Sequence, residues 1–169
     1  MEIQLTVTKN KVFDEVAKTT SYVGHKMPLA EGTDPYTTIF TTDEDKMMLE
    51  RFFNEAANSA TDAMKEYILE VTTYDQPQGT EPLRNYEVTL RMTDNWDARL
   101  ASSMESSLFS YFVDSICAKW FVITNKSETE AYTTKATGHM DDLISKFYHR
   151  VRPQRPNDSP AIGLGLSHH

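Results

Sequence analysis

The chain has almost no cysteine and no long apolar run. Cys117 is the single cysteine in 169 residues, so neither an internal disulfide nor a multi-cysteine metal site can form. No apolar stretch reaches the roughly 18 residues that a membrane-spanning helix needs. The first residues alternate polar and apolar side chains, unlike the basic and apolar regions of a signal peptide. We therefore expect no signal peptide, no membrane contact and a reducing or redox-neutral setting.

An excess of positive charge is also missing, except at one end of the chain. The sequence carries 17 basic and 25 acidic side chains, a net charge of −8. Residues 143–169 have a net charge of +3, whereas residues 1–142 have −11. Because phosphate binding depends on lysine and arginine, the acidic part is a poor surface for holding nucleic acid. Either this acidity only keeps the protein soluble, or it lines a channel through which a polyanion slides.

Length and composition fit one domain with a substantial core. Hydrophobic residues make up 39% of the chain and charged residues 25%. We predict a mainly α protein with a small β element: a helical bundle, a β-hairpin around residues 68–92 and an N-terminal strand. Residues 1–152 are assigned to this single domain. Residues 153–169 contain three prolines and two glycines without periodicity, and we expect an extended or disordered arm there.

The N-terminal part predicts a strand followed by two helices. Residues 2–7 alternate with a period of two, which is typical of a half-buried strand. From Lys11 the apolar spacing becomes helical, and Gly24 suits the end of this helix. Thr41 and Glu44 form a capping box that starts the second helix. The apolar stripe of this second helix consists of Leu49, Phe52, Phe53, Ala56, Ala60, Ala63, Met64 and Tyr67.

Two further strands flank a turn-rich segment. The period of two returns around residues 69–73 and again at 86–92, and residues 75–82 between them carry proline, glycine and aspartate. This pattern predicts an antiparallel hairpin. Since a lone hairpin is marginal in water, it needs a partner, and the N-terminal strand pairs with it either within the chain or between subunits. The residues predicted for pairing between subunits are Ile3, Leu5, Val7, Val88 and Leu90.

The region from Trp96 to Arg152 predicts a long antiparallel helical hairpin. Apolar residues recur at spacings of three and four in both halves. Thr93 or Asp94 is expected to cap the first helix. A capping box that begins at Ser127 predicts a helix start, and Asn125 tolerates the left-handed conformation of a helix end. We therefore expect a break at Asn125; the alternative is one unbroken helix.

No constellation of side chains predicts catalysis or a bound cofactor. His139 and Asp142, three apart on one helix, would supply half a metal site, but no third ligand is visible and a solvated polar edge is favoured. Cys117 has apolar neighbours and no histidine nearby, so it is predicted to be a small buried hydrophobe. The serines between residues 102 and 115 lie in no nucleophile motif and favour close helix packing. We expect no enzyme activity, no cofactor and no metal.

The helical hairpin carries more aromatic side chains than one helix pair buries. They are Tyr111, Phe112, Trp120, Phe121, Phe147 and Tyr148. Either other helices of the chain cover them, or they lie at a subunit interface, where aromatic residues are enriched. The residues predicted for a subunit or portal interface are Tyr111, Trp120, Phe121, Tyr148, Arg150, Arg152 and Arg155.

The capped helix, the β-hairpin and the helical hairpin are followed by a basic helix end at residues 148–153. This order, with the segments Ser107–Val113 and Ala118–Phe121, resembles the head–tail connector (adaptor or ring) proteins of tailed bacteriophages. The segment Phe40–Tyr67 also resembles small proteins of phages of gut bacteria, including crAss-like phages. The chain departs from the connector family in having Trp-Phe at 120–121, where Trp-Tyr is frequent, and in its N-terminal strand.

The resemblance implies a virion structural protein that forms a ring of identical subunits, a dodecamer in the family, between portal and tail. Its partners would be further copies of itself, the portal protein, the tail or next ring protein, and double-stranded DNA that passes through the channel without sequence-specific binding. It would lie at the head–tail interface of the virion after assembly in the host bacterial cytoplasm. The alternative is a small non-enzymatic interaction or regulatory helical module that acts in the bacterial cytoplasm.

Overall fold

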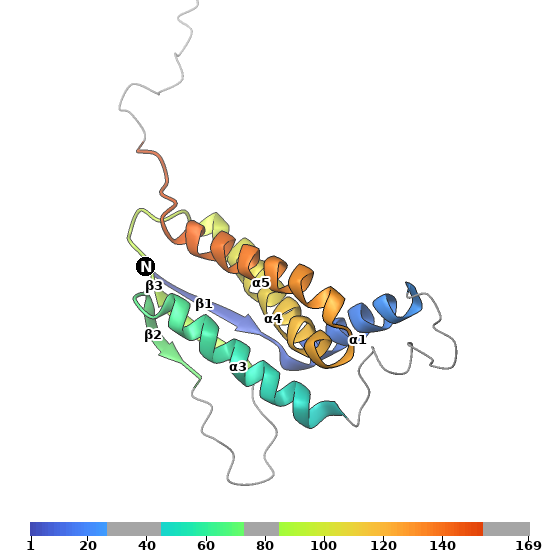
Figure 1. Cartoon of the computed structure of the whole chain (residues 1–169). Coiled ribbons are helices and arrows are strands. Elements are labelled where there is room, and N and C mark those ends of the chain that lie inside the picture. Colours follow the sequence, from blue (N-terminus) through green and yellow to red (C-terminus); the bar gives the residue numbers. More distant parts are fainter. Residues whose placement is uncertain (27–44, 73–84, 154–169) are drawn as a thin grey trace, which may run out of the picture.

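The computed structural model describes residues 1–26, 45–72 and 85–153, which form helices and one small sheet (Figure 1). In chain order the elements are β1 (Glu2–Val7), α1 (Lys9–Lys26), α3 (Lys46–Met64), β2 (Ile68–Val71), β3 (Tyr86–Arg91), the 3₁₀ helix η2 (Ala98–Leu100), α4 (Ala101–Thr124) and α5 (Lys126–Phe147). The predicted fold class, mainly α with a small β element, is confirmed.

The three strands form one antiparallel sheet in the order β1-β3-β2. The N-terminal strand pairs with β3 within the chain, with Ile3 opposite Leu90 and Leu5 opposite Val88. β2 and β3 are also antiparallel, as the predicted hairpin requires, with one irregularity of register in β2. Of the two predicted ways of pairing the N-terminal strand, the structure therefore contains the one within the chain.

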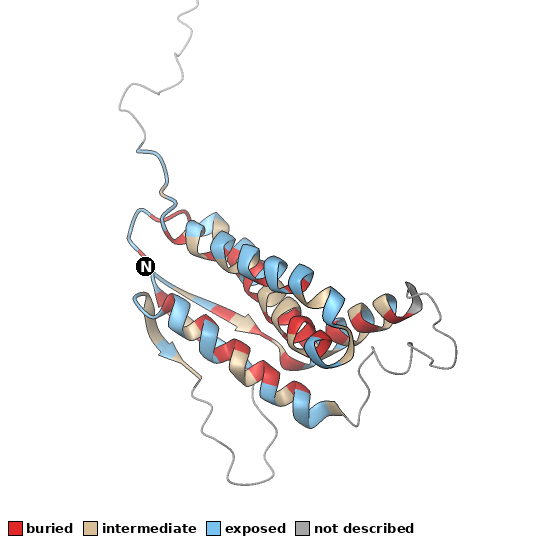
Figure 2. Cartoon of the chain, viewed as in Figure 1, coloured by how far each residue is buried: buried red, intermediate tan, exposed pale blue. Residues whose placement is uncertain are grey.

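One face of the sheet is apolar and buried because the register brings apolar residues together. Leu5 and Val7 of β1 lie opposite Val88 and Tyr86 of β3, and all four are at most 1% exposed. A slip of one residue would turn this whole set toward solvent, so the burial fixes the register. Helices cover the buried side of the strands (Figure 2).

α4 is the central helix of the fold. It contacts β1, α1, α3 and α5. Its buried residues, which lie around most of its circumference, are Met104, Ser107, Leu108, Phe112, Val113, Ile116, Cys117, Ala118, Trp120 and Phe121. A helix that is apolar on nearly all sides is stable only when it is covered on those sides. α5 buries a single stripe instead, so it is the outer helix of the hairpin.

The predicted apolar stripe of α3 is buried in the core. Its buried residues are Leu49, Phe52, Phe53, Ala56, Ala57, Ala60 and Met64. The ring of Phe53 lies edge-on to Phe13 of α1, with centroids 6.0 Å apart, and tilted against Phe112 of α4 at 5.0 Å. The small alanines leave room for another element to approach this helix closely. The predicted stripe differs at Ala63, which is exposed, and at Tyr67, which follows the helix.

The structure also gives the ends of the predicted helices. The first helix ends near Gly24 as predicted, since α1 continues only two residues further, to Lys26. The last helix does not reach Val151, because α5 ends at Phe147. The capping box predicted at Thr41 lies outside the described residues. These ends depend on packing against neighbouring elements, which apolar spacing alone does not reveal.

The predicted break of the helical hairpin at Asn125 is confirmed. α4 ends at the residue before it and α5 begins at the residue after it. Asn125 has φ −155° and ψ 87°, so its backbone is extended and not left-handed as predicted. Ser127 does not cap the helix either, because it lies inside α5 and its Oγ donates to Oδ1 of Asn125 at 2.7 Å. A single extended residue therefore separates the two helices.

The first helix of the hairpin starts later than predicted. Thr93 and Asp94 do not cap it, because α4 begins at Ala101 with Leu100 as its N-cap. Asp97 instead caps the preceding 3₁₀ helix η2, where its Oδ1 accepts the amide hydrogen of Arg99 at 3.2 Å. Trp96 is buried but lies outside any helix, in an antiparallel bridge with Arg150. An apolar residue at helical spacing can thus belong to an extended segment that packs on the same core.

We expect Phe112→Ala to lower the free energy of unfolding by about 3–5 kcal/mol, because a buried aromatic ring is replaced by a cavity. The Phe112 ring contacts Phe53 and Tyr86 and is 0% exposed. Urea unfolding followed by circular dichroism measures the loss. Ile123→Ala is the matched control on the same helix, because Ile123 is 60% exposed, and it should change stability by less than about 0.5 kcal/mol. Equal losses would contradict the central position of Phe112.

Candidate functional site

A short bridge anchored by Trp96 determines where the C-terminal segment leaves the domain. Trp96 and Arg150 are its bridge partners. The indole Nε1 of Trp96 donates to the carbonyl oxygen of Lys146 at 2.8 Å, and the amide of Val151 donates to the carbonyl oxygen of Asn95 at 2.9 Å. Because Trp96 is 1% exposed, this anchor is part of the core.

Beside the bridge lies an aromatic and basic surface, here called the exit surface, made of Tyr67, Tyr148, Arg150 and Arg152. Tyr148 is 62% exposed and meets the ring of Tyr67 edge-on at 6.3 Å. Tyr67 in turn stacks on Phe147 at 4.3 Å. A hydrogen bond with Tyr148, together with burial, raises the pKa of Tyr67 to about 12, so this phenol stays neutral at physiological pH. Arg150 Nη1 donates to the carbonyl oxygen of Phe147 at 2.7 Å, which orients its guanidinium.

Three of the residues predicted for a subunit or portal interface meet at the exit surface. These are Tyr148, Arg150 and Arg152, and both Tyr148 and Arg152 are exposed. Arg155 lies outside the described residues. These three residues are neighbours in the sequence, and the contact that the structure adds is that of Tyr148 with Tyr67.

The other aromatic residues of the predicted interface are covered by the chain itself. Trp120 and Phe121 are 5% and 0% exposed, and Phe121 packs on Tyr132 of α5 at 5.0 Å. Tyr111 is half-buried, with its ring edge-on to Phe112 at 6.1 Å. The sequence left open whether the aromatic residues of the helical hairpin are covered by other helices or lie at a subunit interface. For these buried rings, other parts of the same chain provide the cover. Trp120 and Phe121 are core residues and offer no exposed surface to a partner.

The two edges of the sheet differ in how they are covered. At the outer edge of β1, the amide of Thr6 donates to Oε2 of Glu105 of α4 at 3.0 Å. β2 forms the other edge, and no described strand pairs beyond it. A ring closed by strand pairing needs two different free edges, one for each neighbour. In the described sheet both β1 and β2 are edge strands, and the strand residues predicted for inter-subunit pairing, Ile3, Leu5, Val7, Val88 and Leu90, pair within the chain.

Ser107, Asp142 and Lys146 form a polar clamp between α4 and α5. The Ser107 hydroxyl donates to Oδ2 of Asp142 at 2.6 Å, and the Lys146 ammonium donates to both groups, at 2.8 Å and 2.5 Å. The hydrogen bonds from Lys146 and Ser107 lower the pKa of the Asp142 carboxyl. A carboxylate with a lowered pKa is a weak base, so it does not activate the serine as a nucleophile. The clamp is a structural contact.

His139 lies against Asp114 and not against Asp142, with which it would have supplied half a metal site. Its Nε2 is 3.1 Å from Oδ2 of Asp114 on α4, whereas Asp142 belongs to the clamp. Burial raises the pKa of Asp114, and His139 opposes that shift. Cys117 is buried as predicted, and its burial raises the pKa of the thiol. Across the described ranges, no three histidine, cysteine or acidic side chains are grouped to hold a metal ion.

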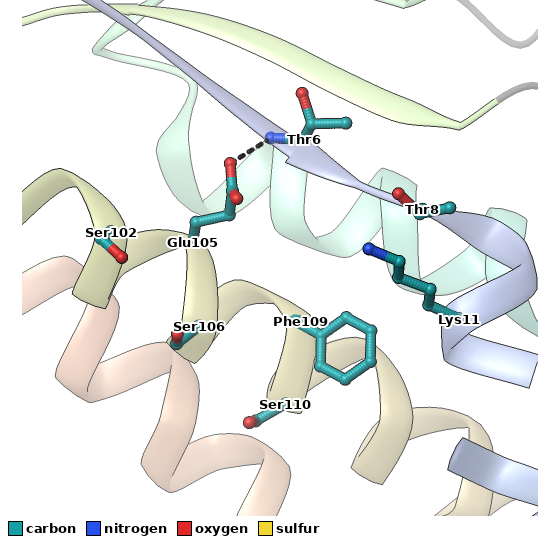
Figure 3. Close-up of a pocket in the computed structure, with 8 residues that line it drawn as sticks. All are labelled: Thr6, Thr8, Lys11, Ser102, Glu105, Ser106, Phe109 and Ser110. Carbon is teal, nitrogen blue, oxygen red and sulfur yellow. Dashed lines mark hydrogen bonds between the residues drawn. The ribbon is translucent and has the colours of Figure 1, made fainter. Parts of the chain in front are cut away.

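An open groove of about 350 Å³ lies where the end of β1, the start of α1 and the first half of α4 meet (Figure 3). It is lined by Thr6, Thr8, Lys11, Ser102, Glu105, Ser106, Phe109 and Ser110. Its lining includes the half-buried ring of Phe109, the ammonium of Lys11 and the carboxylate of Glu105, which accepts the Thr6 amide hydrogen (Figure 3). The groove therefore combines both charge signs and hydroxyl groups around one aromatic ring.

The sequence did not predict this groove. Ser102, Ser106 and Ser110 were expected to serve close helix packing, but Ser102 and Ser106 are exposed and all three face the groove. Their spacing of four residues places them on one face of the helix, and this pattern could have indicated one wall of the groove. The opposite wall depends on how β1 and α1 pack on α4, and spacing along one helix does not reveal that.

Comparisons with known proteins assign no family to this geometry. No protein-family model, no curated protein and no solved structure matches the chain. Within the part of the chain that the structure describes, no helix is long and apolar enough to cross a membrane. The surfaces are therefore interpreted from their own residues and from the resemblance in the order of elements.

We expect Trp96→Phe to loosen the bridge, because it removes the indole donor to the Lys146 carbonyl, whose oxygen then keeps the His149 amide at 3.3 Å. The free energy of unfolding should fall by about 0.5–1.5 kcal/mol. The amide of Val151 should exchange its hydrogen faster, which hydrogen-exchange mass spectrometry measures. His149→Ala is the control, because His149 contributes its backbone carbonyl and not its side chain to this region. Unchanged exchange in Trp96→Phe would contradict the role of the indole as the anchor.

The cap of η2 predicts a stability change at acid pH. Hydrogen bonds from the Arg99 side chain, with Nη2 2.7 Å from Oδ2, lower the pKa of Asp97 to about 2. In the unfolded chain the pKa is about 3.9, so this stabilisation is complete above that value and is lost as the pH falls toward 2. Asp97→Asn should therefore flatten the fall of the urea midpoint between about pH 5 and pH 2.5. Asp62→Asn, at an exposed position of α3, is the control; equal slopes in wild type and Asp97→Asn would contradict the assignment.

Proposed function

We propose that this chain is a non-enzymatic virion structural protein that forms a connector ring between the portal and the tail of a tailed bacteriophage. The observation that carries the proposal is the order of elements, in which α3, the β2–β3 pair and the α4–α5 hairpin lead to a basic C-terminal exit. This is the order that resembles the head–tail connectors. The protein would be located at the head–tail interface of the virion, after assembly in the host bacterial cytoplasm.

The distribution of charge supports a DNA channel. Residues 1–142 carry a net charge of −11, and DNA that moves through a ring must not be held by it. An acidic wall repels the phosphate backbone and has no lysine or arginine cluster to release counterions. Passing double-stranded DNA would therefore be a transient partner without sequence-specific contacts.

The exit surface supports contact with the portal protein. Its exposed Tyr148 gives a large apolar and hydrogen-bonding contact, and Arg150 and Arg152 add positive charge beside it. Tyrosine and arginine are the residue types that most often carry binding energy at interfaces. Because the Trp96 bridge holds this surface on the core, it is presented in a fixed position for a partner.

The subunit contacts of the ring would lie mainly on helices. The resemblance implies a dodecamer with the tail or the next ring protein on its other side. A closed ring needs heterologous contacts, in which one surface of each subunit meets a different surface of the next. Since the strand residues predicted for inter-subunit pairing pair within the chain, helix faces and the C-terminal segment are the surfaces proposed for these contacts.

Cryo-electron microscopy of purified phage particles tests the proposal. We expect density that fits the α4–α5 hairpin in a ring between portal and tail, and peptides of this chain in the particle proteome. Absence from particles would overturn the connector function. In that case a pull-down from infected bacteria that returns a host protein would favour the alternative, a small cytoplasmic interaction module.

We expect Arg152→Glu to weaken co-assembly with the portal while leaving the fold intact, because Arg152 is exposed and its charge is reversed. The fraction of this protein that elutes together with the portal protein from a sizing column should fall by about fivefold, which corresponds to a loss of about 1 kcal/mol of binding free energy. The decrease should be smaller at high salt, because salt screens the charges. Lys126→Glu, the same charge change at the other end of α5, is the matched control. Equal retention for both variants would remove the exit surface from the portal contact.

A further inference from the structure

The second half of α5, residues 139–147, is tied firmly to the rest of the protein. Leu143 and Phe147 are 0% and 1% exposed, and Tyr67 stacks on the Phe147 ring. Lys146 belongs to the polar clamp on α4, and its carbonyl oxygen accepts the indole hydrogen of Trp96. This half of the helix, here called the anchor, is therefore fixed by both apolar and polar contacts.

The first half of α5, residues 126–138, is held by fewer contacts and is here called the cover. It lies beside the last part of α4 (Figure 1) and buries only two side chains, Tyr132 and Ala136. The Tyr132 ring packs on Phe121 of α4 at 5.0 Å. The ammonium of Lys135, 4.5 Å above the same ring, belongs to the cover itself and adds no tie to another element. One aromatic contact and one methyl group thus supply the buried apolar contacts of the cover.

The amino-acid sequence of the cover favours a helix only weakly. Its 13 residues include four threonines and one glycine, which stabilise helices less than alanine does. The helix begins after Asn125 without a hydrogen bond from a capping side chain. Gly138 ends the cover, and no heavy atom lies within 4 Å of the place where a Cβ would be, so packing does not require glycine there. A helical glycine of this kind makes local unfolding easier.

The cover also contains a buried hydroxyl group without a partner. The Oγ1 of Thr129 is inaccessible to solvent and forms no hydrogen bond with the described residues. One turn later, the exposed Thr133 donates its hydroxyl hydrogen to the carbonyl oxygen of Thr129 at 2.8 Å. An unsatisfied buried hydroxyl costs free energy that is regained when water reaches it. The closed position of the cover is therefore less stable than its contacts alone suggest.

Beneath the cover lies an apolar part of α4 that contains a thiol. Cys117 stands one turn before Phe121, and both are 0% exposed. Cys117 is close enough to Tyr132 and Lys135 of the cover to interact with them electrostatically. Glu15 of α1 is also within this range. Movement of the cover would uncover this thiol.

We propose that the cover releases from α4 as a unit while the anchor, the sheet and the other helices stay folded. The extended Asn125 and the helical Gly138 bound the segment that moves. Release exposes Phe121 and Cys117 and hydrates the Thr129 hydroxyl. Such local openings occur where few buried contacts hold an element in place. The release is a property of a single chain, so it goes beyond the connector function and does not depend on it.

The reaction of Cys117 with a small thiol reagent tests the release in the full, folded chain. At low reagent concentration the labelling rate is proportional to the population in which the thiol is exposed. Val88→Ala, in the buried face of β3, lowers global stability, which urea unfolding verifies. We expect it to leave the labelling rate unchanged. A rate that rises about tenfold or more, in proportion to the lost global stability, would overturn the proposal, as would a thiol that reacts only once urea unfolds the protein.

A pair of threonine variants tests whether the cover is the part that moves. Thr129→Val replaces the unsatisfied hydroxyl by a methyl group of similar size and should slow labelling by about fivefold, because the closed state no longer carries that cost. Thr133→Val makes the same change at the exposed position and should leave the rate unchanged. Circular dichroism checks that both variants fold. Equal rates in the two variants would mean that Cys117 is reached by another route, such as movement of α1, and would contradict the release of the cover.

Discussion

The burial of α4 on nearly all sides is the constraint on which the rest of the structure depends. Its residues Leu108, Phe112 and Ile116 are 0% exposed, and the helix contacts β1, α1, α3 and α5. A helix this apolar is costly in water, at about 25 cal/mol for each square ångström of exposed apolar surface. The other elements cover it in the folded chain. Surfaces for partners are therefore found at the ends of the molecule, in the groove and on the outer side of α5.

Polar contacts then set where α5 lies on this covered helix. The Ser107–Asp142–Lys146 clamp and the pairing of His139 with Asp114 join the two helices directly. Trp96 adds a bond to the carbonyl of Lys146. Lys146 thus takes part both in the clamp and in the bridge that positions the C-terminal exit. These partly exposed polar contacts fix how α5 lies on α4, and the buried Trp96 holds the exit surface on the core.

Local periodicity predicted the elements but not how they meet. The alternation in β1 and β3 and the stripe of α3 follow from spacing within short windows. The break at Asn125 lies where it was predicted, although Asn125 is extended and Ser127 does not cap the helix. Trp96 was misplaced in a helix because its spacing matches one, whereas its partners Lys146 and Arg150 lie about fifty residues away. Trp120 and Phe121 were read as interface residues because their burial depends on α4 being covered all round. Of the predicted site, Tyr148, Arg150 and Arg152 meet at one surface; the groove was missed because three separate elements build it.

We propose that this fold works as a ring of identical subunits. The acidic body and the basic exit held by Trp96 suit such a ring. The most direct measurement is the native mass of the purified full chain over a range of concentrations. We expect one discrete closed species at a multiple of the 19.3 kDa subunit mass. A protein that remains monomeric at every concentration, with the portal protein present as well as absent, would contradict it.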